Sequence, residues 1–209
     1  MSAKSVRKCS KGAVQVTSVQ TQPTTRTLAG VPAPEAGVYD IDASHSHVGF
    51  SVRHMMVSKV RGRFDEYKGE VTVGEDPSDS RVEVTIEAGS IDTSEPNRDN
   101  HLRSSDFFNI EEYPQLVFRS GKIISGHDGN FELKGELEIF GRTNPVTLDV
   151  EWLGSVVDPY GNTRIGFSAK TEVDREAFGL TYNAALEAGG VVIGKKVNLE
   201  LEIEAIRRA

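Results

Sequence analysis

Apolar residues recur at every second position along most of this 209-residue chain. Between residues 131 and 139, Phe131, Leu133, Leu137 and Ile139 alternate with charged side chains. Successive side chains of a β-strand point to opposite faces, so such a run predicts a strand with one apolar and one polar face. Comparable runs lie at residues 48–56, 60–64, 69–73, 82–88, 116–118, 146–152, 165–173 and 197–203. One apolar face per strand is typical of antiparallel sheets.

The connections between these runs predict their topology. Residues 127–130, 141–145 and 158–162 combine glycine, asparagine, aspartate or proline, which favours tight turns between neighbouring strands. About eight strands that share one apolar face must cover a second layer or close on themselves, and closure removes the exposed edges. We therefore predict an all-β fold, an extended antiparallel up-and-down β-barrel of about eight strands. A β-sandwich with a filled core is compatible with the same alternation.

The predicted inward positions carry many Val, Leu, Ile and Gly residues but few aromatic ones. An eight-stranded barrel can be filled by its own side chains or can hold one small ligand. Because the inward side chains are of modest size, we expect a cavity in the barrel. A filled core is the alternative, and it would make the chain a structural β-domain without a ligand.

Residues 1–37 differ in composition from the rest of the chain. They are rich in Ser, Thr, Gln, Pro and Ala without periodic apolar positions, so we expect a disordered or weakly ordered extension. Residues 38–209 then form one domain. The basic start of the chain has no apolar segment of the kind that follows it in a secretory signal, which leads us to expect a cytoplasmic protein. The single cysteine, Cys9, excludes a disulfide within the chain.

The charge of the chain bears on its partners. A formal net charge of -7 repels phosphate backbones, so we expect no nucleic-acid partner. Lys59, Arg61 and Arg63 nevertheless alternate along one predicted strand and place a basic stripe on its outer face. That stripe either makes transient contact with an anionic membrane surface or is simply a solvated face.

Two segments interrupt the period of two. Residues 94–103 are predicted to form a short helix, because Thr93 or Ser94 is a candidate N-cap and Pro96 lies in the first turn. Residues 174–179 form a second, shorter helix candidate. We expect one or two short helices beside the barrel.

The first predicted helix carries a cluster of polar side chains. Arg98, Asp99, His101 and Arg103 lie within six residues. A guanidinium presents a rigid fork of donors that suits oxygen-rich anions, so the two arginines could bind a ligand head group at the mouth of the barrel. Alternatively, Arg98 and Asp99 bond to neighbouring groups and attach the helix across the end of the barrel.

Other polar combinations are weaker indications of chemistry. His45, His47, His54 and His101 are imidazoles that could bind a transition metal, but no spacing on a single element supports a site, so we expect no metal and no cofactor.

A triad of Ser46, His101 and Asp99 can be composed from the sequence. The glycine-flanked serine turn and the oxyanion-hole pattern that accompany a nucleophilic serine are missing. We therefore expect no catalytic residues. An enzyme that acts on a lipid or small substrate through the His, Asp and Arg cluster is the alternative.

Six motifs give the chain a resemblance to a known family. They are His45-Ser46-x-x-x-Phe50-x-x-x-His54, Gly62-Arg63-Phe64, Arg98-Asp99-x-His101-Leu102-Arg103-Ser104-x-Asp106-Phe107, Tyr113-Pro114-x-x-x-Phe118, Gly135-x-Leu137-x-Ile139-x-Gly141-x-Thr143-x-Pro145-Val146-Thr147-Leu148, and Asp158-Pro159-Tyr160-Gly161 followed by Arg164-x-Gly166-Phe167. In their order and spacing, from residue 38 to the C-terminus, they closely resemble the YceI-like family.

The resemblance implies a lipocalin-like barrel that binds a polyisoprenoid, such as a polyprenyl pyrophosphate or quinone precursor, or another long-chain amphiphile, usually as a homodimer. Many relatives are periplasmic. The family would bind, transport or store its ligand without catalysis. The positions expected to contact the ligand tail are Phe50, Val52, Phe64, Phe118, Leu133, Leu137, Phe167 and Leu201. Those expected near its head group are His45, His54, Arg98, Asp99, His101 and Arg103.

Overall fold

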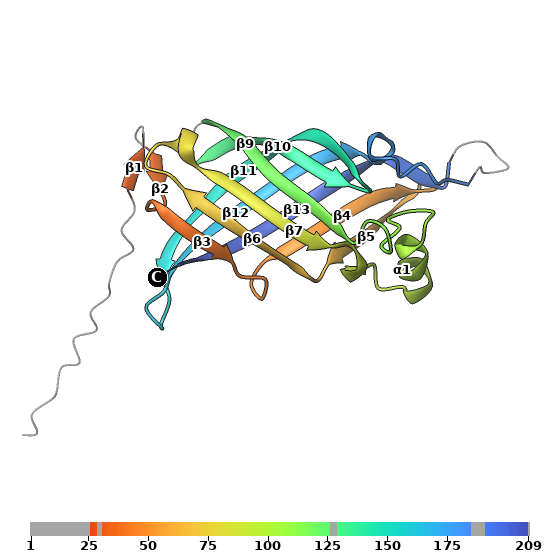
Figure 1. Ribbon diagram of the computed structural model, residues 1–209, viewed down its shortest axis with the longest axis horizontal. Coiled ribbons are helices and arrows are strands. Elements are labelled where there is room, and N and C mark those ends of the chain that lie inside the picture. Colours follow the sequence, from red (N-terminus) through yellow and green to blue (C-terminus); the bar gives the residue numbers. More distant parts are fainter. Residues whose placement is uncertain (1–25, 29–30, 126–128, 185–190, 209) are drawn as a thin grey trace, which may run out of the picture.

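The computed structural model describes residues 26–28, 31–125, 129–184 and 191–208 (Figure 1). The strands are β1 (Arg26–Leu28), β2 (Val31–Ala33), β3 (Gly37–Ile41), β4 (His47–His54), β5 (Ser58–Phe64), β6 (Tyr67–Val73), β7 (Arg81–Glu87), β8 (Ile91–Asp92), β9 (Gln115–Ser125), β10 (Asn130–Ile139), β11 (Arg142–Val157), β12 (Thr163–Asp174) and β13 (Ile193–Arg207). The helices are η1 (Pro77–Asp79), η2 (Ala88–Ser90), α1 (Pro96–Arg103) and η3 (Arg175–Phe178).

The strands close into an eight-stranded antiparallel barrel. β3 and β4 follow one another along the same edge of β13, β6 and β5 pair with them in turn, and β7 and β8 pair with β6 and β5. Three of the eight barrel strands are therefore each made of two consecutive segments, β3 and β4, β5 and β6, and β7 and β8. The interruptions lie at residues 42–46, 65–66 and 88–90. The long pairing of β12 with β13, from Arg164↔Ile206 to Asp174↔Lys196, closes the circle. The predicted up-and-down barrel is confirmed, and the sandwich is excluded.

The inward faces of the strands form the apolar interior. The larger cluster of buried residues includes Leu133 and Leu137 of β10, together with Leu148 and Val150 of β11. A smaller cluster is formed by Tyr39, Val71, Val73, Ile165 and Ala205. The alternation of buried and exposed positions along β10 and β11 agrees with the period of two in the sequence.

The α1 helix lies at one end of the barrel, and the β1–β2 pair and the C-terminus lie at the opposite end (Figure 1). Pro96 occupies the first turn, as predicted, but the predicted cap at Thr93 or Ser94 is wrong. The Glu95 carboxylate caps the helix instead, by accepting hydrogen bonds from the N–H groups of Asn97 and Arg98. Within the described chain, no helix combines the length and the apolar character needed to cross a bilayer.

The second predicted helix forms as the 3-10 turn η3. The Asp174 carboxylate accepts a hydrogen bond from the Glu176 N–H at 2.9 Å and so caps its start. Gly179 ends the turn with a φ of 87°, a left-handed conformation that glycine adopts without steric cost.

The predicted extension is described only from residue 26 onward. There β1 and β2 pair in an antiparallel ladder, and the Arg26 guanidinium donates to the carbonyl oxygens of Pro34 at 2.9 Å and Glu75 at 3.0 Å. The bond to Glu75 attaches the ladder to the turn that follows β6. Residues 1–25, for which we predict disorder, lie outside the described residues.

The apolar face of β4 ends earlier than the sequence suggests. Met56 continues the alternation from Val52 and His54, but the chain reverses there, and Met55 and Met56 adopt φ values of 49° and 62°. Met56 is 67% exposed, so its assignment to the inward face is wrong. The reason is that a tight β4–β5 turn places its central side chains outside both faces of the sheet.

A network around Arg164 of β12 joins three distant segments. Its guanidinium donates to Asp42 at 2.7 Å, in the break between β3 and β4, and to Asp158 at 2.9 Å, in the β11–β12 turn. It also pairs with Glu204 of β13. Asp158, Asp42 and Arg164 keep 7%, 13% and 17% of their side-chain surface exposed. Arg164 therefore connects the break between β3 and β4 to β13 and to the β11–β12 turn.

The same network sets the ionisation of two carboxyl groups. Hydrogen bonds from Ser44 and Arg164 hold the pKa of Asp42 well below its usual value. Hydrogen bonds from Arg164 and Asn162 do the same for the pKa of Asp158. Because both pKa values are lower in the folded state, their contribution to stability is present above the ordinary carboxyl pKa and is lost as the pH falls below it.

We predict that Arg164→Met lowers the melting temperature at pH 7 by several degrees, since Asp42 and Asp158 lose their shared cation. Arg119→Met is the control, because Arg119 pairs with Glu83 where both side chains are more than half exposed. Scanning calorimetry from pH 7 to pH 3 should also show a weaker acid dependence for Arg164→Met than for the unaltered chain. Equal losses in both variants at every pH would contradict the role of the network.

Candidate functional site

The barrel encloses a cavity of about 680 Å³. Inward side chains from strands all around the barrel line it, and nearly all of them are apolar. Ligand pockets in proteins typically span about 300–1,000 Å³, so this volume suits one small or medium-sized molecule. The eight residues predicted to contact a ligand tail all lie on the wall of this cavity: Phe50, Val52, Phe64, Phe118, Leu133, Leu137, Phe167 and Leu201. Their contact with a ligand stays a prediction.

Two glycines on the inward face keep the space open. A Cβ atom on Gly135 would lie 2.7 Å from the ring of Phe118, and one on Gly62 would lie 2.5 Å from the ring of Phe50. Each phenylalanine thus occupies the space that a side chain on the neighbouring strand would otherwise fill. The two glycines therefore make room for these rings on the wall of the cavity.

The polar residues at the start of α1 bond to the protein itself. The Asp99 carboxylate is buried and accepts hydrogen bonds from the Thr93 N–H at 2.9 Å and the Thr93 hydroxyl at 2.5 Å. The Arg98 guanidinium donates to the hydroxyl and the carbonyl oxygen of Thr93 at 2.7 and 2.9 Å. These contacts attach α1 to the segment that follows β8.

Arg103 at the other end of α1 acts in the same way. Its guanidinium donates to the carbonyl oxygens of Gly89 at 2.8 Å and Ile91 at 2.7 Å. The structure thus matches the alternative in which the charged residues of this helix fasten it across the end of the barrel. Neither Arg98, Asp99 nor Arg103 lines the cavity. A head-group role for them stays a prediction that these contacts do not support.

The predicted histidines do not form one group: His45 and His47 lie at the start of β4, His54 at its other end and His101 on α1. His45 Nδ1 lies 2.8 Å from the carboxylate of Asp42, and His101 Nε2 lies 2.9 Å from that of Asp106. His54 ends β4, seven residues from His47 at its start, which separates them by roughly 23 Å. His45, His54 and His101 are also absent from the lining of the cavity. The Ser46 hydroxyl bonds to the backbone of Glu204, so the described contacts do not connect it to His101 or Asp99.

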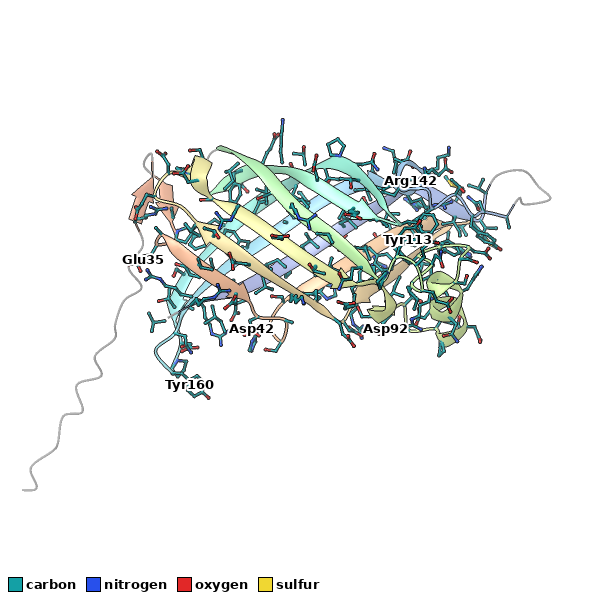
Figure 2. The ribbon with its side chains drawn as sticks, viewed as in Figure 1. Glu35, Asp42, Asp92, Tyr113, Arg142 and Tyr160 are labelled. Carbon is teal, nitrogen blue, oxygen red and sulfur yellow. The ribbon has the colours of Figure 1, made fainter. Side chains whose placement is uncertain are left out.

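One group of possible metal ligands occurs among the described residues. Oxygen and nitrogen atoms of Asp42, His45 and Glu204 lie within 4.8 Å of one another. They belong to the outer surface near the end that carries Tyr160 (Figure 2). Because Arg164 is hydrogen-bonded to both carboxylates, a positive charge already occupies this group.

The cavity wall also contains a buried cation that sequence reasoning missed. Arg175 of η3 is only 5% exposed, and burial lowers the pKa of its guanidinium. It stays charged at neutral pH, because the ordinary pKa of an arginine lies far above 7. In the sequence Arg175 stands between two acidic residues in a short polar turn, a pattern typical of an exposed side chain. Only the folded chain places it against the cavity.

These features define a class of protein, the closed eight-stranded barrels that enclose an apolar cavity. The model of the YceI-like domain matches residues 39–205, and the chain belongs to that family. A UPF0312 protein of Staphylococcus aureus is 36% identical over 170 residues, which cover 79% of this chain and 95% of the relative. A UPF0312 protein of Vibrio cholerae is 30% identical over 174 residues, 82% of this chain and 87% of the relative.

Solved structures share the fold at lower identity. The YceI protein of Campylobacter jejuni superimposes with a TM-score of 0.64 at 29% identity and covers 75% of this chain and 90% of its own. BcnA of Burkholderia cenocepacia gives 0.68 at 20% identity, with 78% and 98% covered. A polyisoprenoid binding domain from Saccharophagus degradans gives 0.60 at 16% identity, with 83% and 100% covered. The last two show a common fold.

We predict that Asp99→Ala lowers the free energy of unfolding by about 2–3 kcal/mol, because two donors on Thr93 lose a buried, charged acceptor. Asp106→Ala is the matched control, since its carboxylate is about half exposed and pairs with an exposed histidine. Urea denaturation measures both. If the two variants unfold at the same urea concentration, the contacts at Thr93 do not fasten the helix.

Proposed function

We propose that this protein binds a polyisoprenoid or a similar long-chain amphiphile in its barrel and carries or stores it without chemical change. The observation that carries the proposal is the apolar cavity of about 680 Å³ inside a closed barrel. A molecule that is mostly hydrocarbon is the ligand that such a wall favours, because apolar surface gains free energy on leaving water.

The size of the hydrophobic term supports a tail-driven interaction. Each buried methylene contributes about 0.8 kcal/mol, so one five-carbon isoprene unit contributes roughly 3–4 kcal/mol. Two or three units would then reach the free energy of micromolar to nanomolar binding, about 8–12 kcal/mol. The ligand head group would mainly set orientation and selectivity.

Two further observations support the proposal over its alternatives. The Saccharophagus degradans structure of the same fold is described as polyisoprenoid binding, in line with what the family resemblance implies. The alternative is an enzyme that uses the charged residues of α1. Arg98, Asp99 and Arg103 instead bond mainly to Thr93 and to backbone carbonyls, which disfavours that alternative. A structural domain with a filled core is disfavoured by the cavity itself.

We predict that Ala169→Trp abolishes ligand uptake, because Ala169 lies on the cavity wall of β12 and an indole there would fill part of the lumen. Lys170→Trp introduces the same side chain at the adjacent, exposed position and should bind as the unaltered chain does. Titration with a fluorescent polyprenol analogue measures both dissociation constants, and we expect at least a tenfold difference.

Native mass spectrometry supplies a second readout for the same pair. Protein purified without added lipid should carry an adduct of several hundred daltons that Ala169→Trp lacks and Lys170→Trp retains. A bare mass for the unaltered chain, together with no uptake of offered polyprenols, would overturn the proposed function.

We further propose that the β4–β5 turn touches a membrane surface during transfer of the ligand. Met55, Met56 and Val57 are 43%, 67% and 83% exposed at the end of the barrel near α1 (Figure 1). The exposed Lys59 and Arg61 of β5 follow them. An apolar tip beside basic residues suits the interface of a bilayer with anionic lipids.

Serine substitutions of Met56 and Val57 together should slow transfer of a polyprenol from anionic vesicles several-fold and leave equilibrium binding intact. The control is Tyr160→Ser, which removes an 88% exposed side chain from the opposite end (Figure 2). Stopped-flow transfer measures the rates. Slowing by the Tyr160 variant, or by neither variant, would exclude this turn as the docking point.

The homodimer implied by the family and the cytoplasmic location stay predictions. Sedimentation equilibrium measures the first, and fractionation of cells measures the second.

A further inference from the structure

One donor group of Arg175, a residue that lines the cavity, has no partner among the described residues. Arg175 Nε donates to the carbonyl oxygen of Gly194 at 3.0 Å, and Nη1 donates to those of Leu180 and Tyr182. Nη2 is buried and makes no hydrogen bond. The guanidinium is therefore held by three backbone contacts, while both N–H groups of Nη2 remain unused.

The charge of Arg175 also lacks a bonded counter-ion in the described part of the chain. Its two acidic neighbours are engaged elsewhere, Asp174 with the Glu176 N–H at 2.9 Å and Glu176 with Lys195 at 2.6 Å. Burying a cation without a hydrogen-bonded anion is costly, and so is leaving a buried donor unpaired. An anion at Nη2 would remove both costs.

The neighbours of Arg175 show at which end of the cavity it lies. Phe178 and Leu180 flank Arg175 on the cavity wall, and the ring of Tyr182 lies 5.1 Å from that of Phe107, next to α1. Two further arginines line this wall, both at the opposite end. Arg26 donates to the carbonyl oxygens of Pro34, Gly74 and Glu75, and Arg81 at the start of β7 is exposed to solvent. Among the arginines that line the described wall, the buried donor without a partner is therefore that of Arg175, at the α1 end.

We propose that Arg175 binds the oxyanion head of an amphiphilic ligand, a phosphate or a carboxylate, at the α1 end of the cavity, with the hydrocarbon tail along the lumen. This inference rests on the proposed function and deepens it by naming the head-group class and the residue that selects it. A neutral alcohol of the same length would place a weaker acceptor at Nη2 and leave the buried charge uncompensated.

The test compares three ligands with one tail, namely geranylgeraniol, geranylgeranyl monophosphate and geranylgeranoic acid. Each is delivered from cyclodextrin to the full chain, and its dissociation constant is measured by calorimetry. We expect at least one of the two anions to bind the unaltered chain about tenfold or more tightly than the alcohol, the gain that a charge-assisted hydrogen bond provides. Preference for phosphate alone or for carboxylate alone identifies the natural class of head group.

Arg175→Gln should reduce this preference to within about threefold. Arg103→Gln is the matched control, because it removes a guanidinium near the same end that lies outside the cavity lining, and it should keep the preference. If Arg175→Gln does not fold, the unaltered chain still decides the point. The N–H signals of Arg175 in the NMR spectrum should then shift with an anionic ligand and stay in place with the alcohol.

The outcomes separate the two proposals. Binding of none of the three ligands would overturn the proposed function. Equal binding of alcohol and anions by the unaltered chain would overturn the role of Arg175 and leave the function standing. Loss of the preference in Arg103→Gln but not in Arg175→Gln would assign the head group to the helix instead.

Discussion

The pairing of β13 with neighbours on both of its edges is the constraint on which the rest of the structure depends. One edge bonds to β12, and the other bonds first to β3 and then to β4. This closure leaves the sheet without a long free edge and fixes the circumference of the barrel. The walls cannot then move inward to fill space that their own side chains leave empty. A cavity of about 680 Å³ therefore remains inside the closed circle of eight strands, although eight phenylalanines and Trp152 line it. The expectation of few aromatic residues on the inward face is wrong.

Polar side chains in this fold mainly fasten the helix, the turns and the breaks between strands to the barrel. Arg98 and Arg103 fasten α1 to backbone and hydroxyl groups, and Arg164 joins the break between β3 and β4 to the β11–β12 turn. The interior is left almost entirely to hydrocarbon. Arg175 departs from this division, because it reaches the cavity with part of its guanidinium unpaired. The proposed binding of an amphiphile rests on this combination of a hydrophobic lumen and one unpaired donor.

The strands, their inward faces and the barrel could be predicted from the sequence because the period of two is local. Phe50, Phe118 and Leu137 follow directly from it, and all three line the cavity. The resemblance to the YceI-like family added a prediction of the class of ligand. Its most prominent polar motif, around Arg98 and Arg103, led the prediction toward a head-group site, although the helix uses those side chains for its own attachment.

What the sequence by itself determined is therefore which side chains face inward, since alternation along a strand needs no knowledge of distant residues. Tertiary structure alone decided how polar groups are used. Glu95 rather than Thr93 caps α1, because the helix begins at Pro96, and Met56 leaves the inward face because the chain turns there. Arg175 is buried where its own turn, with the carbonyl of Leu180, meets the start of β13, with the carbonyl of Gly194. Hydrogen-bond partners and burial are set by contacts between remote parts of the chain, and a local pattern does not contain them.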